Sequence, residues 1–347
     1  MSFRTIILIG NFLSAFGGSR GPIEDLRDAL LLRGRKVICG STSKSRIRRL
    51  CDIFHVVLLL APKWSIAIVD VYSGMAFITA LIAALGLQIR RIPYILTLHG
   101  GALPTFALQH PRLVALVFRK AARITCPSPY LARSFCTHAN RMVVISNPVD
   151  VSLHSLRATS RELRRILWLR SFHETYNPMM ALRTFGRVRK IFPDSSLTMV
   201  GPDKGDGSFD RCRAYAAASG LDAEVTFVMG IPKHDVPEIM SQHDIFLNTT
   251  HVDNTPVTLI EAMASGLVVI STRVGGIPDL VTDGIHAHLV PDDDDHAMGD
   301  VLMRVMTDMD ATREMAATAR RHAEQFDIQI VSKRWLELID DIRSLPS

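Results

Sequence analysis

Residues 5–10 are Thr-Ile-Ile-Leu-Ile-Gly, an uninterrupted apolar run that ends on a glycine. Similar short runs recur through the first half of the chain, and stretches with helical spacing such as Ile23–Arg33 lie between several of them. Continuous apolar strands that alternate with helices are typical of a parallel sheet covered on both faces. We therefore predict a doubly wound α/β domain with strands at Thr5–Ile9, Val37–Cys39, His55–Leu60, Ala67–Val69, Tyr94–Leu98, Ile124–Cys126 and Met142–Ile145.

The second half repeats this alternation after the polar stretch 150–161, which we interpret as a linker. The chain has 347 residues, about twice the length of one ordinary domain. We expect two doubly wound, Rossmann-like domains at 1–155 and 156–328, and a last helix at 329–347 that crosses back onto the first domain. Ligands of such sheets bind beyond the carboxyl ends of the strands. A cleft between two facing domains is therefore the expected site.

One long segment, residues 71–89, contains no charged residue. Its length matches what a helix needs to cross a bilayer, but polar residues and glycines interrupt it, among them Tyr72, Ser73 and Gly86. We interpret it as a helix buried against the sheet. The first apolar run is too short to be the core of a signal peptide with its cleavage site. We therefore expect a cytoplasmic protein.

Composition excludes several classes of protein. Hydrophobic residues make up 48% of the chain and charged residues 21%, which is typical of globular proteins and not of disordered ones. The five cysteines include no Cys-x-x-Cys pair. This argues against a disulfide scaffold or a zinc site and indicates a reducing compartment.

The positive charge is concentrated in the first half of the chain. Residues 1–150 hold 19 Lys and Arg against 6 Asp and Glu, whereas residues 151–347 hold 21 against 28. A basic half of this kind favours an anionic partner. We expect it to rest on the inner face of the cytoplasmic membrane as a peripheral protein, and we expect no nucleic acid partner because basic and aromatic residues are not interleaved. The residues we assign to this surface are Arg20, Arg33, Arg35, Lys36, Lys44, Arg46, Arg48, Arg49, Phe12, Leu13, Phe16 and Trp64.

Two common phosphate-binding motifs are missing from the sequence. The chain has no Gly-x-x-x-x-Gly-Lys-Ser/Thr motif, so it is not a P-loop protein. The glycines after the first run are Gly10, Gly17, Gly18 and Gly21, which do not form Gly-x-Gly-x-x-Gly. This pattern argues against a nicotinamide or flavin dehydrogenase.

The segment 248–266 carries the most chemical information. A loop with Asp253 leads to a helix that we expect to begin near Pro256, with Glu261 two turns inside and Gly266 at its end. Free amides at a helix start bind anions, and an acid on either side could hold sugar hydroxyls. A nucleotide sugar has this layout. The alternative is an Asp that caps the helix and a Glu that is solvated on its surface.

The same segment resembles the donor site of the family 4 retaining glycosyltransferases with the GT-B fold. The resemblance rests on the spacing from Asp253 to Glu261, the sequence Glu-Ala-Met-Ala-Ser-Gly at 261–266 and Val-Gly-Gly-Ile-Pro at 274–278. It extends over nearly the whole chain. Further matches are Gly17-Gly18, Leu98-His99-Gly100, Asn147-Pro148-Val149-Asp150, Gly201-Pro202-Asp203 and Phe227-Val228-Met229-Gly230.

The resemblance implies a role for each candidate residue. Glu261 would bind the ribose of the nucleotide, Asp253 would contact the transferred sugar, and Arg170 would grip the diphosphate. His99 would orient a donor or acceptor hydroxyl. The remaining donor-site residues by the same resemblance are Gly17, Gly18, Tyr176, Gly201, Ile231, Asn254, Thr255, Pro256, Val257, Thr258 and Leu259.

Three positions depart from the family pattern. Asp253 stands where the family usually has Glu, and Leu169 stands where it has Gly before the arginine. The family's diphosphate lysine is missing, and Tyr176 lies near its place. Tyr176 could donate a hydrogen bond but brings no charge, and His173 nearby could supply charge only when protonated.

By this resemblance the expected reaction is hexose transfer from a nucleotide diphosphate sugar to a glycan or a lipid-linked acceptor. Two other functions remain open: a nucleotide-sugar epimerase of the same fold, and a non-catalytic binding protein. The fold implies no metal cofactor. We accordingly interpret the acidic run Asp292–Asp295 as loop and helix-capping acids and not as a cation site.

Overall fold

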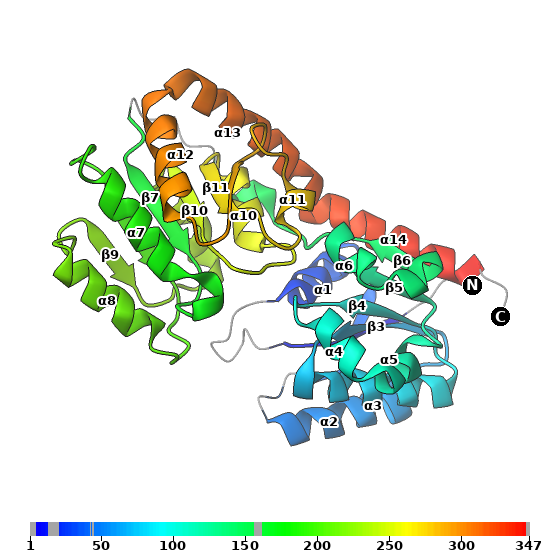
Figure 1. The fold of residues 1–347 in the computed structure, drawn as a ribbon. Helices are drawn as coiled ribbons and strands as arrows, with labels where there is room; N and C mark the ends of the chain where they lie inside the picture. The colour runs from blue at the N-terminus through cyan, green and yellow to red at the C-terminus, as the bar shows by residue number, and fades with distance from the viewer. Residues whose placement is uncertain (1–4, 13–20, 42, 44, 156–161, 345–347) are drawn as a thin grey trace. The chain divides into compact units, whose positions relative to one another are not determined.

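The computed structural model describes residues 5–12, 21–41, 43, 45–155 and 162–344. The chain divides into unit 1, residues 1–148 with 328–347, and unit 2, residues 149–327 (Figure 1). The first boundary therefore lies before the expected one at residue 155. The physical reason is that Val149 and Val151 pack in a core of unit 2, where Val149 pairs with Asp327.

Unit 1 contains a parallel sheet in the order β2-β1-β3-β4-β5-β6. Successive residues of its central strands are buried on opposite faces: Ile7 packs in one core, whereas Ile6 and Leu8 pack in the other. Both faces are thus covered, which explains the continuous apolar runs. The strands are β1 (Thr5–Ile9), β2 (Lys36–Cys39), β3 (Ser65–Val71), β4 (Tyr94–Leu98), β5 (Arg123–Cys126) and β6 (Met142–Val144).

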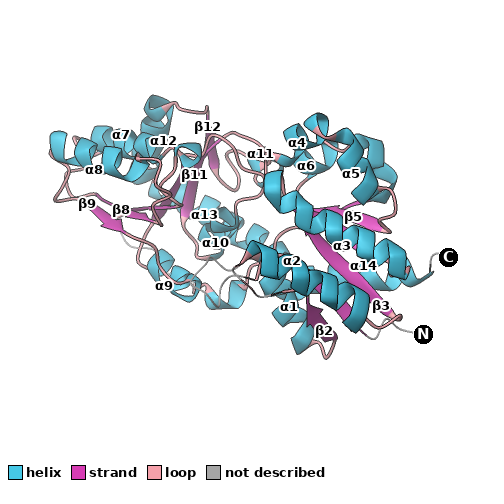
Figure 2. Ribbon diagram, turned by 90° about the horizontal axis from the view of Figure 1, so that it is seen from below, coloured by secondary structure: helices cyan, strands magenta, loops and turns pink. Residues whose placement is uncertain are grey.

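Helices cover both faces of this sheet, as Figure 2 shows from below. α1 (Pro22–Leu32) and α14 (Ile328–Ser344) pack on one face. Arg33 joins them through hydrogen bonds to Gln329 and Ser332. The other face carries α2 (Arg46–His55), η2 (Val56–Leu60), α3 (Phe77–Arg90), α4 (Leu103–Gln109), α5 (Pro111–Phe118) and α6 (Pro129–Arg133). The short turn η3 (Gly74–Ala76) precedes α3, and η4 (Cys136–Arg141) follows α6.

The prediction of a strand at His55–Leu60 is wrong. This run ends α2 and continues as the π-helical turn η2. Val56 and Val57 face the core, while Leu59 and Leu60 are exposed. A short apolar run does not distinguish strand from helix by its periodicity, and here the preceding helix simply continues.

The uncharged segment 71–89 forms the end of β3 and most of α3. One side of α3 is buried in the core, including Ala80, Ala84 and Leu87. None of the helices in the described part of the chain has both the length and the hydropathy that a membrane span requires. The expectation of a helix packed on the sheet is confirmed for this side of α3.

Several residues that we expected in an exposed basic surface are instead buried or paired with other groups of the protein. Phe12 is buried, so it does not contribute to an exposed surface. Arg35 pairs with Asp340 of α14, and Arg49 donates to the carbonyl of Ser43. Leu13, Phe16, Arg20 and Lys44 lie outside the described residues.

Unit 2 contains a second parallel sheet in the order β12-β11-β10-β7-β8-β9. Trp168 lies at its centre, is wholly buried, and donates its indole N–H to the hydroxyl of Thr249 at 2.9 Å. The strands are β7 (Arg165–Leu169), β8 (Ser196–Val200), β9 (Val225–Val228), β10 (Ile245–Asn248), β11 (Val268–Thr272) and β12 (His288–Val290).

The helices of unit 2 again pack on both faces of the sheet. α7 (Pro178–Val188), α8 (Ser208–Ala218) and α12 (Asp295–Thr307) pack in one core. The other core receives α9 (Val236–Ser241), α10 (Val257–Ala264), α11 (Ile277–Leu280) and α13 (Met309–Ala323). The short turns are η5 (Val151–Leu153), η6 (Glu174–Tyr176), η7 (Lys233–Asp235) and η8 (Glu324–Phe326). Both units are therefore doubly wound α/β domains, as predicted.

Candidate functional site

The predicted donor-site residues of unit 2 follow the carboxyl ends of its strands. Arg170 follows β7, Gly201 follows β8, Ile231 lies after β9, and the loop with Asp253 follows β10. All these strands are parallel. Their carboxyl ends therefore meet at one edge of the sheet, where ligands of doubly wound sheets bind.

Arg170 and Asp253 form an ion pair at this edge. The Nη2 of Arg170 donates to Oδ2 of Asp253. The two side chains are only 15% and 16% exposed, so water screens the pair weakly. The Nε of Arg170 is buried and has no hydrogen-bond partner among the residues that the structure describes. The guanidinium thus keeps an unused donor beside a carboxylate.

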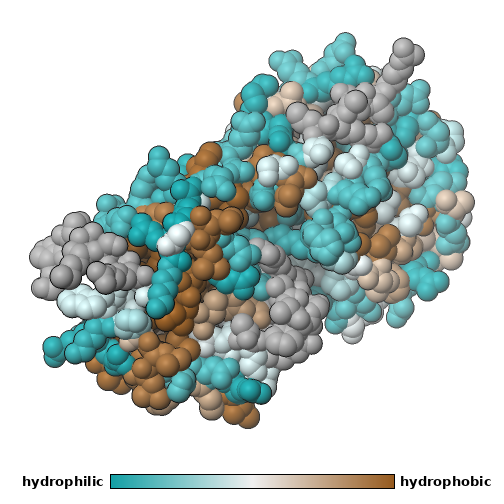
Figure 3. Space-filling model, turned by 180° about the vertical axis from the view of Figure 1, so that it is seen from behind, coloured by the Kyte–Doolittle hydropathy of each residue, from teal (hydrophilic) through white to brown (hydrophobic). Residues whose placement is uncertain are grey.

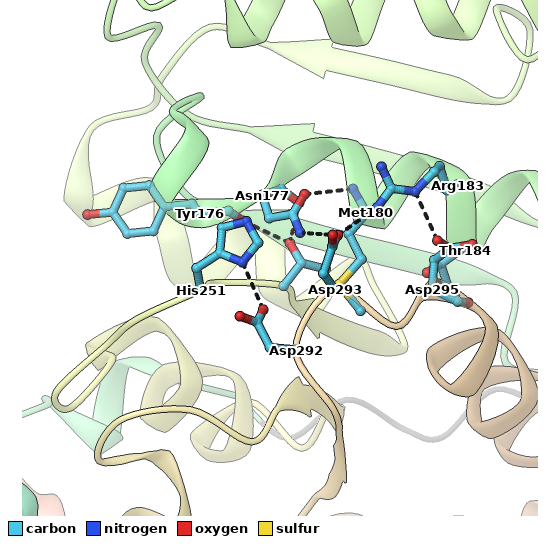
Figure 4. A network of polar contacts seen from close by, with 10 residues as sticks. Tyr176, Asn177, Met180, Arg183, Thr184, His251, Asp292, Asp293 and Asp295 are labelled. Atoms are coloured by element: carbon cyan, nitrogen blue, oxygen red, sulfur yellow. Dashed lines mark hydrogen bonds and ion pairs between the residues drawn. The ribbon is translucent and has the colours of Figure 1, made fainter.

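Tyr176 lies against the guanidinium. Its ring centroid is 5.1 Å from the Cζ of Arg170, within the range of a cation–π contact. The ring of Tyr176 extends away from the acidic residues in Figure 4. Near the place of the family's missing lysine, this chain therefore has Tyr176, whose ring contacts the guanidinium of Arg170.

His173, the other group considered as a source of charge, points to a different partner. Its Nε2 lies 3.9 Å from Asp206, and its Nδ1 accepts the N–H of Thr175. Burial alone would raise the pKa of Asp206, but hydrogen bonds from the amides of Glu174 and Ser208 and from the Ser208 hydroxyl lower it to about 2. His173 therefore faces a carboxylate that stays ionised.

Two glycines allow the backbone to approach Arg170 and Asp253. A Cβ on Gly201 would lie 1.7 Å from the carbonyl oxygen of Arg170, and a Cβ on Gly275 would lie 1.9 Å from that of Asp253. Gly275 also has a φ of +54°, and the next amide, that of Gly276, donates to the same Asp253 carbonyl at 2.9 Å. The positions of both charged residues thus depend on glycine.

We expect Gly275→Ala to lower the free energy of unfolding of unit 2 by about 2–4 kcal/mol, because the added Cβ meets a backbone atom and the left-handed conformation is strained. Gly284→Ala is the matched control: φ is +74° there, but no atom lies within 4 Å of the added Cβ. Its loss should be about 1–2 kcal/mol. Urea unfolding followed by circular dichroism measures both. Equal losses would show that the contact with Asp253 is unimportant.

The start of α10 provides unused donors next to this ion pair. Pro256 precedes the helix in an extended conformation, and its carbonyl accepts the amide of Leu259 at 3.1 Å. The amides of Val257 and Thr258 have no acceptor within the described residues. The buried hydroxyl oxygen of Thr258 has no hydrogen-bond partner there either. A helix start with open donors favours an anion.

The two acids do not match the alternative of a capping Asp and a solvated Glu. Asp253 does not cap α10, since Pro256 occupies that position and the Oδ1 of Asp253 accepts the amide of Asn254 at 2.7 Å. Glu261 is only 6% exposed. Glu261 therefore does not lie solvated on the helix surface, and its contact with the ribose stays a prediction from the resemblance.

The remaining predicted donor-site residues differ in how far their side chains are buried. Asn254, Thr255 and Pro256 are buried before the helix. The side chain of Leu259 is fully buried in the core, so only its backbone could face a ligand. Ile231 is partly buried and packs against the same core. Gly17 and Gly18 lie outside the described residues.

His99 lies in unit 1, after β4, and has a buried partner that sequence reasoning missed. Its Nε2 lies 3.0 Å from Oδ1 of Asp70, and its ring stacks on that of Tyr72 at 4.9 Å. Burial raises the pKa of Tyr72, and the charge of Asp70 raises it further. Gly10 permits this arrangement, since a Cβ there would lie 2.3 Å from Asp70. The position of Asp70 at the end of β3, the strand next to β4, is the signal that could have found it.

His99 and Asp70 line a small cavity of unit 1 together with Thr97, Asn147 and Trp335. Its volume is about 20 Å³, enough for about one water molecule. A hexose does not fit in this cavity. His99 would therefore contact a ligand only at the mouth of the cavity, with Asp70 and Tyr72 holding its ring.

The acidic run 292–295 is occupied by protein partners (Figure 4). Asn177 and Arg183, at the start and in the middle of α7, supply several of them. The contacts are Asp292 with His251 at 2.8 Å, Asp293 with Asn177 at 2.9 Å and Arg183 at 2.8 Å, Asp294 with the amide of Ala297 at 2.8 Å, and Asp295 with Arg183 at 2.9 Å. The run thus caps α12 and ties it to α7 and to the loop after β10, as loop and capping acids would.

Two family models match this chain. The model described as Glycosyltransferase Family 4 matches residues 16–153, and the model described as Glycosyl transferases group 1 matches residues 158–322.

Curated relatives match part of the chain. The D-inositol 3-phosphate glycosyltransferase of Corynebacterium glutamicum is 25% identical over 217 residues, which are 58% of this chain and 52% of that protein. A Campylobacter jejuni enzyme named as a GalNAc-alpha-(1->4)-GalNAc-alpha-(1->3)-diNAcBac-PP-undecaprenol alpha-1,4-N-acetyl-D-galactosaminyltransferase is 23% identical over 206 residues, 59% of this chain and 56% of the enzyme. The chain spans about half the length of these relatives.

Solved structures match nearly all of it. HepE of Anabaena, in complex with UDP and glucose, superposes with a TM-score of 0.77 at 17% identity, over 97% of this chain and 100% of that one. Sucrose-phosphate synthase from Thermosynechococcus elongatus superposes with a TM-score of 0.79 at 16% identity, over 98% and 99%. At these identities the likeness establishes the fold. With the two family models covering its two halves, the chain belongs to the family 4, or group 1, glycosyltransferases and has the GT-B fold.

Proposed function

We propose that this protein is a retaining glycosyltransferase that moves a hexose from a nucleotide diphosphate sugar to a hydroxyl of a glycan or lipid-linked acceptor in the synthesis of cell-surface polysaccharide or glycolipid. One observation carries the proposal. A guanidinium with an unused donor, the paired carboxylate of Asp253 and the open amides at the start of α10 lie along one stretch of the sheet edge. Such a set suits a diphosphate with a sugar attached.

Arg170 would neutralise the diphosphate as it leaves. A guanidinium has five N–H donors, so Arg170 can keep its bond to Asp253 and still donate to phosphate oxygens. The ring of Tyr176 would hold the plane of the guanidinium, which matters more here because the second cation of the family pattern is missing. The amides of Val257 and Thr258 would share the same charge.

Asp253 would orient hydroxyls of the transferred sugar, and Glu261 would bind the ribose. Same-face attack by the acceptor, assisted by the leaving phosphate, would retain the anomeric configuration. No protein nucleophile is required by this scheme. Because Arg170 and the helix start supply the positive charge, we expect the reaction to proceed without a metal cofactor.

The comparisons support the class of reaction. The curated relatives are named as glycosyltransferases that act on an inositol phosphate or on a lipid-linked glycan. HepE was crystallised with UDP and glucose, and also with UDP-glucose. The chemistry of the site described above fits the same kind of donor.

The test is nucleotide release. We expect UDP or GDP to appear when the protein is incubated with its nucleotide sugar and an acceptor extract, with the rate within about twofold in the presence of EDTA. Product formed from the donor alone would indicate the epimerase instead. A folded protein that binds no nucleotide diphosphate at millimolar concentration would be the non-catalytic binding protein and would remove the proposal.

A further inference from the structure

The helices that cover one face of the unit 1 sheet have an apolar outer side. α3 illustrates this best: Ile78, Leu85 and Ile89 recur at helical spacing and are exposed, Ile89 by 76%. The solvent-facing side of a surface helix ordinarily carries charged residues, yet α3 has no charge before Arg90. The apolar residues on the inner side of α3 pack against the sheet, but this packing does not explain the apolar residues on its outer side.

The neighbouring elements extend this surface. Leu59 and Leu60 of η2 are exposed, Leu59 by 70%, and so are Ile47 and Phe54 of α2, Ile47 by 77%. α2, η2 and α3 contact one another, and Figures 1 and 2 both place α2 beside α3. Figure 3 shows hydrophobic residues gathered at the lower left, on the part of unit 1 that carries these helices. We call this surface the apolar face: Ile47, Phe54, Leu59, Leu60, Ile78, Leu85 and Ile89.

The charges around the apolar face are mostly positive. Between Asp28 and Asp150 the sequence contains only two acids, Asp52 and Asp70. Asp70 is buried beside His99, and Asp52 accepts the hydroxyl of Ser41 at 2.7 Å. Arg48, Lys63 and Arg91, in contrast, are exposed. An apolar surface with a predominantly cationic rim is complementary to an anionic lipid bilayer, which offers both an apolar interior and negative headgroups.

We infer that the apolar face is a docking surface for an anionic membrane, with its leucine, isoleucine and phenylalanine side chains inserted at the boundary between headgroups and acyl chains. This inference does not depend on the proposed donor site in unit 2. The rim shares Arg48 with the basic surface predicted from sequence, whereas Phe12 of that surface is buried.

Two other occupants fit less well. A second copy packed through the same face would bring Arg48, Lys63 and Arg91 near their own counterparts, and like charges oppose association. A nucleic acid would pair with the cations but would gain little from the aliphatic side chains.

Flotation with lipid vesicles tests the inference on the full chain. We expect it to float with vesicles of phosphatidylcholine and phosphatidylglycerol but not with phosphatidylcholine alone, and salt should weaken the binding. The double variant Leu59→Ser/Leu60→Ser should lower the partition coefficient about tenfold or more. Arg48→Glu should lower it at low salt only.

The matched control is Leu32→Ser. Leu32 is an exposed leucine of α1, on the opposite side of the same sheet, and its loss should leave flotation unchanged. Binding of UDP or GDP measured on every variant separates failure of docking from failure of the proposed function. The inference is overturned if the wild type does not float with anionic vesicles, or if Leu59→Ser/Leu60→Ser floats as well as the wild type. It is also overturned if light scattering shows that this variant only dissociates an oligomer.

Discussion

Replacing Arg170 with alanine should lower kcat about 10²–10³-fold and leave the fold intact, because the guanidinium is the one side-chain cation that we assign to the leaving diphosphate. The diphosphate of the bound donor is already negative, and a further negative charge develops on it as the glycosidic bond breaks. The loss should therefore appear mainly in kcat and less in the KM for the donor. Arg170→Lys should recover only part of the rate, since an ammonium keeps the charge but cannot reproduce the fork or the stacking on Tyr176.

Arg165→Ala is the control for this prediction. Arg165 begins the same strand, β7, at its other end and pairs with Asp244 at 3.2 Å. Arg165→Ala breaks an arginine–aspartate pair but leaves the carboxyl ends of the strands unchanged. We therefore expect its kcat to stay within about twofold of the wild type. Thermal unfolding of both variants checks the fold. If Arg170→Ala keeps most of the wild-type kcat, the diphosphate is not held by Arg170 and the proposed mechanism fails.

Replacing Glu261 with glutamine should raise the donor KM about 100-fold and change kcat much less. The buried carboxylate is assigned two charge-assisted hydrogen bonds from the ribose, each worth roughly 1.5–3 kcal/mol, and the amide keeps its volume but not its charge. These bonds exist in the ground state as well as in the transition state, so their loss raises KM. Isothermal titration with UDP or GDP should give the same ratio.

A deoxyribonucleotide provides the second arm of this experiment. The wild type should bind the 2′-deoxy diphosphate more weakly than the ribonucleotide, whereas Glu261→Gln should distinguish the two poorly. Glu238→Gln, in an exposed position on the short helix α9, serves as the control and should bind as the wild type does. If Glu261→Gln still discriminates between the two nucleotides as the wild type does, Glu261 does not contact the ribose.

Several elements of the fold follow directly from local sequence. The strands β1 and β4 have the predicted boundaries, Thr5–Ile9 and Tyr94–Leu98. Both strands are buried along their whole length, so the pattern and the packing agree. At His55–Leu60 they do not, because a short run that follows a helix can continue it, and only packing decides which.

The sequence predicts which residues belong to the candidate site, but it does not predict which of them contact one another. The resemblance selects Arg170, Asp253 and Glu261 from motifs, and the end of each strand tells which residues reach the sheet edge. That Arg170 pairs with Asp253, 83 residues away, depends on β7 and β10 being neighbours. The pair Asp70 and His99 likewise requires β3 beside β4.

Chain pattern alone thus establishes two doubly wound α/β domains, because burial on both faces of a sheet requires uninterrupted apolar strands with helices between them. It also predicts the two acids and the helix start of the candidate donor site. The tertiary structure decides which charged groups form pairs, at which positions only glycine fits, and which apolar side chains remain exposed to solvent. Those outcomes depend on strand order and on the surface that each helix leaves uncovered, and neither is written in local periodicity.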